Sequence, residues 1–159
     1  IFNWVGLFGD QDKDKSILFL MATVPGMPLI YTGQEAANED RLEFFERDPV
    51  DWKDYPLEDF YRTLLNLKKR NQALWNGDFG GEYVPVKNNA ENKVVAFMRA
   101  KNENSVFTII NLSGDKLEIT LLGNGFAGEY TDALNGKKAT FIENHQLKLK
   151  PWDYRIYIK

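Results

Sequence analysis

The sequence predicts an α+β chain in which a helix–strand–helix segment precedes an antiparallel all-β sandwich of about eight strands, Greek-key-like in arrangement. Apolar residues recur at helical spacing over 14–23 and 56–71, and the hydrophobic period falls to two after Gly77. We therefore expect a boundary near residue 77, with one part over 1–77 and the other over 78–159.

Composition limits the classes of partner. The chain has 159 residues, a net charge of −3 and scattered rather than clustered Lys and Arg, so we expect no nucleic acid and no anionic membrane as partner. No apolar run approaches the roughly 20 residues that span a bilayer. Cysteine is absent, which excludes disulfides and thiolate sites. The start at Ile1 rather than Met suggests a piece of a longer protein, and the cellular location stays open.

The first predicted helix covers 14–23, with Asp14 as its N-cap. Its apolar positions are Ile17, Leu18, Leu20, Met21 and Val24. Pro25-Gly26 ends it. The second predicted helix covers 56–71, and Pro56 suits its first turn. Its apolar stripe consists of Leu57, Phe60, Tyr61, Leu64 and Leu67, followed by Asn71.

Between the two helices, Met27–Tyr31 is short, apolar without alternation, and bracketed by Pro and Gly. This pattern is typical of a parallel strand covered on both faces. One parallel strand cannot make a sheet, so its neighbours are expected outside this chain. A long charged loop over 32–53 follows, and loops of such length in compact domains are often functional.

Beyond residue 77, short runs with β-strand character are separated by turn residues. We expect strands at about 81–86, 93–100, 105–112, 116–122, 127–133, 138–142, 146–150 and 153–158. Asn135-Gly136 predicts a two-residue hairpin, because both residues tolerate the positive φ of a type I′ turn.

Four stretches carry a resemblance to a known family: "PGMPLIYTGQE" at 25–35, "DW" at 51–52, "PLEDFYRTLLNLKKRNQAL" at 56–74 and "LKPWDYRIYI" at 149–158. Together they resemble the C-terminal portion of the α-amylase family of glycoside hydrolases, family 13-like. The resemblance implies a remnant of a (β/α)8 barrel, namely its seventh helix, eighth strand and eighth helix, followed by the family's C-terminal β-sandwich.

The same resemblance implies where the chemistry lies. Retaining glycosidases use a carboxylate nucleophile and a carboxylic acid about 5 Å apart. In the family, these residues and a third Asp in an Asn-His-Asp motif all precede the eighth strand, hence lie upstream of Ile1. Asn144-His145 is followed by Gln146 and is not that motif. We therefore expect no catalytic residue in this chain and no turnover by it alone, although the parent enzyme would act on α-linked glucans.

Substrate contacts are a separate expectation. Gln34 and Glu35 follow the predicted strand at its carboxyl end, which faces the active site in such barrels. By resemblance, Asp40 and Arg41 occupy the part of the loop where some members bind glucose units. The alternatives are a loop salt bridge for Asp40 and Arg41, and an organising role at the strand end for Glu35. The loop's other acids are expected to be solvated.

The remaining candidates are expected to be structural. His145 is the one histidine, so we expect no metal and no cofactor. Four tryptophans could stack on sugar rings, although core or junction positions are favoured: Trp4, Trp52, Trp75 and Trp152.

Two other functions stay open, a carbohydrate-binding or structural β-sandwich module, and a partner protein that adds residues 27–31 to another sheet. Hydrolysis, transglycosylation and isomerisation are not distinguished.

Overall fold

A computed structural model describes residues 11–37, 45, 47–50, 52 and 57–159. Two α-helices, α1 (Gln11–Thr23) and α2 (Glu58–Arg70), are followed by two short 3-10 turns, η1 (Gln72–Leu74) and η2 (Gly77–Phe79). The strands are β1 (Val84–Pro85), β2 (Val94–Lys101), β3 (Asn104–Asn111), β4 (Leu117–Thr120), β5 (Gly128–Asp132), β6 (Lys138–Phe141), β7 (Gln146–Leu149) and β8 (Tyr154–Ile158). Each overlaps a run in which the sequence predicts a strand.

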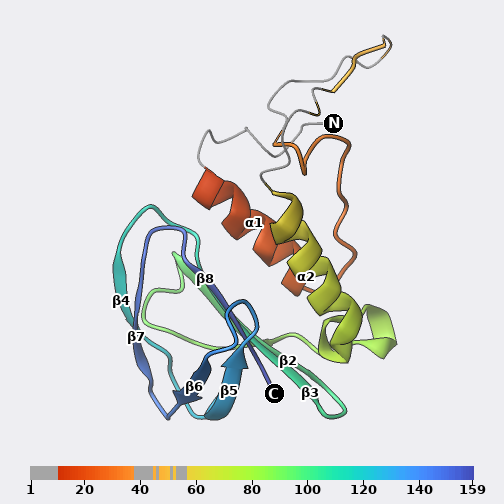
Figure 1. Cartoon of the computed structure of the whole chain (residues 1–159). Helices are drawn as coiled ribbons and strands as arrows, with labels where there is room; N and C mark the ends of the chain where they lie inside the picture. Colours follow the sequence, from red (N-terminus) through yellow and green to blue (C-terminus); the bar gives the residue numbers. More distant parts are fainter. Residues whose placement is uncertain (1–10, 38–44, 46, 51, 53–56) are drawn as a thin grey trace.

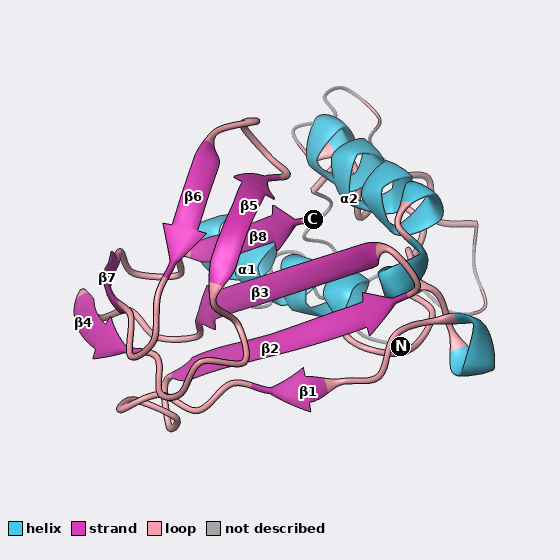
Figure 2. Ribbon diagram, turned by 90° about the horizontal axis from the view of Figure 1, so that it is seen from below, coloured by secondary structure: helices cyan, strands magenta, loops and turns pink. Residues whose placement is uncertain are grey.

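The strands form one large antiparallel sheet and one small ribbon. The large sheet has the order β1-β2-β3-β8-β5-β6, and β4 pairs with β7 in the ribbon. The helices cover one face of the large sheet and the ribbon lies on its other side (Figure 1). The large sheet is therefore the middle of three layers, and β2 and β3 run across it side by side (Figure 2).

The core between the large sheet and the ribbon is rich in aromatic rings. Phe107 lies at its centre, with ring centroids 5.1 Å from Phe141 and 5.5 Å from Phe126. Ile119 of β4 and Leu149 of β7 close it from the ribbon side. Because successive side chains of a strand point to opposite faces, Phe107 and Ile109 enter this core while their neighbours point to the helices.

The second core lies between the helices and the other face of the same sheet. Its buried members come from α1, α2, η1, β3 and β8: Phe19, Ala22, Leu64, Ala73, Leu74, Val106, Ile110 and Ile156. From Val106 to Asn111, every residue of β3 is buried, as expected for a strand covered on both sides. Helical and strand residues thus share one core across residue 77.

Both predicted helices are present, but α1 begins earlier than predicted. It starts at Gln11, and Asp14 lies buried inside the first turn rather than at the N-cap. Asp12 and Asp14 both occupy this turn, where negative charge favours the positive end of the helix dipole. That preference extends the helix one turn beyond its apolar pattern.

The prediction of a strand buried on both faces at 27–31 is wrong for this structure. The segment has no regular secondary structure, and Met27 and Leu29 are 84% and 74% exposed. Pro28 and Ile30 are half-buried and, together with the edge of Leu29, line a small apolar gap against α1 and α2. One face of the segment therefore rests on the helices, while the described residues supply neither a cover for its other face nor a strand to pair with it.

The tight hairpin lies elsewhere than predicted. Asn135-Gly136 belongs to a four-residue loop, which is closed by hydrogen bonds from Asp132 N–H to Lys137 O and from Gly136 N–H to Asp132 O, both 2.8 Å. The Asp132 carboxylate accepts from the amides of Leu134 and Asn135, and this favours the longer loop. The two-residue turn is Asn102-Glu103 between β2 and β3, with Asn102 at φ 53°.

The helical layer predicts a strong response to truncation of Phe19. This side chain is fully buried, and its ring centroid lies 4.9 Å from that of Tyr154 on the sheet. We expect Phe19→Ala to lower the free energy of unfolding by about 3–5 kcal/mol, measured by urea denaturation, because it opens a cavity between two layers. Leu122→Ala at an exposed position is the control, with a change within about 0.5 kcal/mol. A similar small change in Phe19→Ala would contradict the packing of α1 on the sheet.

Candidate functional site

The turn that follows residues 27–31 carries the first two predicted site residues. Gln34 is buried, and its Oε1 accepts a hydrogen bond from Tyr31 N–H at 2.6 Å. Its own amide donates to Tyr31 O at 3.0 Å, and Gly33 has φ 91°, so the chain reverses tightly here. The side chain of Gln34 thus stabilises its own turn, and a contact to substrate remains a prediction.

Glu35 lies beside the turn with one carboxylate oxygen enclosed. Its Oε2 is buried without a hydrogen-bond partner, and its backbone carbonyl accepts from Leu57 N–H at the start of α2. The hydroxyl of Tyr61 on α2 is also buried and unpartnered. Burial raises the pKa of the Tyr61 phenol, and the carboxylates of Glu35 and Asp14 raise it further. The turn and the neighbouring α2 therefore each hold one buried polar atom whose hydrogen-bonding capacity is unused.

Asp40 and Arg41, the other two predicted contacts, lie outside the described residues. The structure consequently brings Gln34 and Glu35 to one turn and leaves the pairing of Asp40 with Arg41 as a prediction. Tyr61 was not among the predicted site residues, because its place in the apolar stripe of the second helix favoured a purely packing role.

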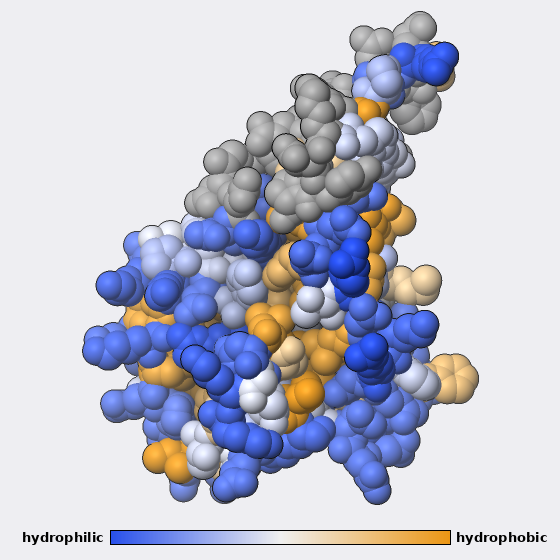
Figure 3. Space-filling model, viewed as in Figure 1, coloured by the Kyte–Doolittle hydropathy of each residue, from blue (hydrophilic) through white to orange (hydrophobic). Residues whose placement is uncertain are grey.

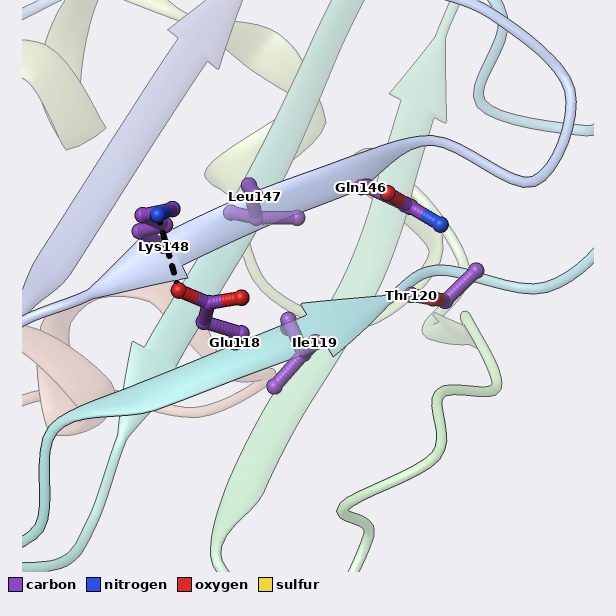
Figure 4. A pocket seen from close by; sticks show the side chains of 6 residues that line it. All are labelled: Glu118, Ile119, Thr120, Gln146, Leu147 and Lys148. Carbon is purple, nitrogen blue, oxygen red and sulfur yellow. Dashed lines mark ion pairs between the residues drawn. The ribbon is translucent and has the colours of Figure 1, made fainter.

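A second candidate lies on the β4–β7 ribbon. A hollow of about 450 Å³ is lined by Glu118, Ile119, Thr120, Gln146, Leu147 and Lys148. Glu118 and Lys148 face each other across the two strands and form an ion pair of 2.8 Å, and Thr120 and Gln146 lie at the other end (Figure 4). The hydrogen bond and charge of Lys148 hold the pKa of Glu118 below its usual range. A proton donor at neutral pH needs the opposite shift.

A third hollow is mainly apolar and lies beside the segment 27–31. It measures about 620 Å³ and is lined by Met27, Pro28, Leu65, Lys68, Lys69, Trp75, Asn76 and Phe79. Apolar surface is visible on the right-hand side of the helical layer in Figure 3, where Figure 1 places the segment after α1. An apolar patch of this kind marks a contact surface more often than a site of chemistry.

Of the four tryptophans, Trp75 and Trp152 contact residues of the two helices, and Trp4 lies outside the described residues. The Trp75 indole N–H donates to Lys69 O at 3.2 Å, and the Lys13 ammonium lies 5.3 Å from the Trp152 ring centroid. Trp52 is 42% exposed. His145 lies against Phe141, with ring centroids 4.8 Å apart.

Among the described residues, no group of three or more His, Asp or Glu side chains could hold a metal ion. No helix of the described residues has the length and apolarity to cross a membrane.

Comparison with known proteins shows similarity to α-amylases and related enzymes. Residues 94–154 match the model of the α-amylase SusG C-terminal domain. Over 99% of its length the chain is 29% identical to α-amylase 2 of Dictyoglomus thermophilum, and over 79% it is 27% identical to an amylopullulanase of Thermoanaerobacter thermohydrosulfuricus. It spans 27% and 9% of the lengths of these two proteins.

The fold has solved counterparts. The crystal structure of a maltogenic α-amylase of Thermotoga neapolitana superposes with a TM-score of 0.76 over 94% of this chain and 36% of that one, at 17% identity. The two helices and the mainly antiparallel strands match the C-terminal region of such amylases. The family match and the sequence relatives confirm the resemblance to the C-terminal domain of α-amylases, and the barrel remnant expected over residues 1–77 stays a prediction.

The unpartnered hydroxyl of Tyr61 predicts an unusual result for its removal. Tyr61→Phe should leave the free energy of unfolding unchanged or raise it by up to about 1 kcal/mol, because no hydrogen bond is lost and a buried polar atom disappears. Tyr130→Phe is the matched control: that hydroxyl donates to Phe126 O at 2.9 Å, and its loss should cost about 1 kcal/mol. Thermal denaturation of both variants checks this, and a loss above about 1 kcal/mol in Tyr61→Phe would contradict it.

The junction beside the apolar hollow predicts a pH effect. Lys68 donates to Leu74 O at 2.7 Å, and burial lowers the pKa of its ammonium to about 8, with Arg99 adding to the effect. Between this pKa and the ordinary value of 10.5, the unfolded chain binds more protons, so the free energy of unfolding rises with pH through that window.

We expect a gain of about 1 kcal/mol between about pH 7.5 and about pH 9.5, a value reduced for partial solvent screening of the ammonium. Lys68→Met should lack this gain. Urea denaturation of both proteins at the two pH values measures the difference. An identical pH dependence would show that burial does not disfavour the charge on Lys68.

Proposed function

Because the chain is related to α-amylases and carries a match to their C-terminal domain, we propose that it is the C-terminal part of an enzyme acting on α-linked glucans. Residues 1–77 end the (β/α)8 barrel with its seventh helix, eighth strand and eighth helix, and residues 78–159 form the β-sandwich behind it. The catalytic carboxylates belong to the portion upstream of Ile1. By itself the chain does not turn over glucan.

The exposed apolar face of residues 27–31 is the observation that carries this proposal. Met27 and Leu29 are mostly exposed, although Leu29 borders the gap against α1 and α2 and Met27 borders the apolar hollow beside α2. A barrel strand has this requirement: helices cover its outer face, and its inner face and both edges need other strands. The short span of the chain on its relatives, 27% of the first, leaves room for those strands.

The chemistry of the described carboxylates supports the expected inactivity. A retaining glycosidase needs one carboxylic acid protonated near neutral pH beside a second, ionised one. Glu118, the carboxylate on the ribbon hollow, is paired with Lys148 and held ionised. Glu35 lies near Tyr61, and its Oε2 is enclosed rather than open to a ligand.

Contact with substrate falls to the turn after the strand. In the intact enzyme, Gln34, Glu35, Asp40 and Arg41 would lie at the carboxyl end of the eighth strand, on the side of the active site. Glu35 Oε2 and the Tyr61 hydroxyl are enclosed without a hydrogen-bond partner here, so Glu35 would reach a sugar only if this turn opens in the intact enzyme. Gln34 would keep the turn closed, as it does here.

The test is release of reducing ends from soluble starch by the 159-residue chain and by the full-length protein that contains it. We expect turnover by the full-length protein and none above buffer by the chain. Glu118→Gln in the chain is the control for chemistry on the ribbon. Turnover by the chain would contradict the absence of catalytic carboxylates. If the Glu118→Gln chain then lost this turnover, the chemistry would lie on the ribbon instead. Titration of the chain with malto-oligosaccharides separates the module alternative, which requires binding; loss of that binding on changes at Thr120 or Gln146 would place the site in the ribbon hollow.

A further inference from the structure

Arg99 on β2 is the largest fully buried side chain of the described residues, at 1% exposure. Its hydrogen-bond partners among the described residues are three backbone carbonyls. Nε donates to Gly81 O at 3.1 Å, Nη1 to Thr23 O at 3.1 Å, and Nη2 to Trp75 O at 2.7 Å. In the described part of the chain, no carboxylate pairs with this guanidinium. A buried cation held only by carbonyls fixes the positions of the segments that supply them.

These three carbonyls come from three separate segments. Thr23 is the last residue of α1, Trp75 lies between η1 and η2, and Gly81 precedes β1. Carbonyls at the end of a helix lack partners within it and carry the negative end of the helix dipole, so a cation suits this position. Arg99 therefore reaches from the middle sheet to the end of α1 in the helical layer.

Two glycines, Gly80 and Gly81, allow the backbone segments around Arg99 to come close to one another and to the guanidinium. A Cβ atom at Gly80 would lie 1.8 Å from Trp75 O and 3.0 Å from Arg99 Nη2. A Cβ atom at Gly81 would lie 2.6 Å from the amide nitrogen of Ala100. The Gly80-Gly81 pair thus makes room for the carbonyls around the guanidinium, and any larger residue at either position would displace them.

Thr23 leads directly into the segment that ends at Gln34. Its hydroxyl donates back to Phe19 O at 2.9 Å, and Val24 N–H donates to Leu20 O at 3.0 Å, so the end of α1 is well defined. From Pro25 to Ile30, the backbone makes no hydrogen bond with another described residue. The path of this segment therefore depends on its apolar contact with α1 and α2 and on where its two ends are held, and Arg99 holds the first.

We propose that Arg99 is a positioning residue through which the β-sheet fixes the end of α1 and hence the course of residues 24–34. Only a guanidinium serves, because its planar fork presents several N–H groups in different directions at once. A lysine at this position keeps the charge and reaches one carbonyl of the three. The inference concerns this chain's own residues and stands whether or not the parent acts on glucans.

Amide hydrogen exchange of the full 159-residue chain, read residue by residue by NMR, tests this inference. In Arg99→Lys, we expect the amides of Thr23, Val24 and Tyr31 to exchange about ten-fold faster or more, while the amides of β3 keep their rates. Arg99→Met should give a larger local effect of the same pattern.

Arg155→Lys is the matched control, because the guanidinium of Arg155 binds Asp153 and Lys148 O within the β part alone. Exchange at the end of α1 should be unchanged in that variant. Equal acceleration in α1 and β3 of Arg99→Lys would mean a general loss of stability, and no acceleration in α1 would mean that Arg99 holds nothing there. Either result overturns the proposal.

Discussion

The contact of α1 and α2 with one face of the middle sheet is the constraint on which the other features depend. β3 and β8 have apolar residues on both faces, so each face requires a cover. A fully buried aliphatic side chain contributes about 1.5–3 kcal/mol, and Val106, Ile110 and Ile156 together approach the whole stability of a typical domain. The β part therefore cannot shed the helices without exposing its own core.

Arg99 fixes the orientation of α1 on the sheet, which the apolar contact alone does not. Apolar packing alone is tolerant of sliding, because it scales with area and not with orientation. Hydrogen bonds to Thr23 O, Trp75 O and Gly81 O admit one arrangement of the three segments. The burial of a charge disfavours folding, and burial lowers the pKa of Arg99 as well as that of Lys68. The same junction thus combines a hydrophobic contact with a costly but specific polar one.

The sequence predicts the local elements well and the polar junction poorly. Strands and helices follow from periodicity, and the apolar stripe from Leu57 to Leu67 identifies α2 within two residues. Arg99 has carbonyls as partners, and backbone carbonyls leave no trace in a residue pattern. The position of Tyr61 in an apolar stripe indicates packing, and Asn135-Gly136 indicates a tight turn unless the competing carboxylate of Asp132 is included. The predicted strand at 27–31 is missing because strand formation depends on neighbours that the described residues do not include.

The solvent exposure of Met27 tests most directly whether residues 27–31 are a strand that the rest of a barrel covers in the parent protein. Methionine oxidation by dilute peroxide, followed by mass spectrometry of the chain and of the full-length protein, measures that exposure, with the half-buried Met21 and Met98 as internal references. If residues 27–31 form a barrel strand in the parent, Met27 oxidises faster than both references in the chain and becomes protected in the full-length protein. Equal, rapid oxidation of Met27 in both proteins would contradict the account.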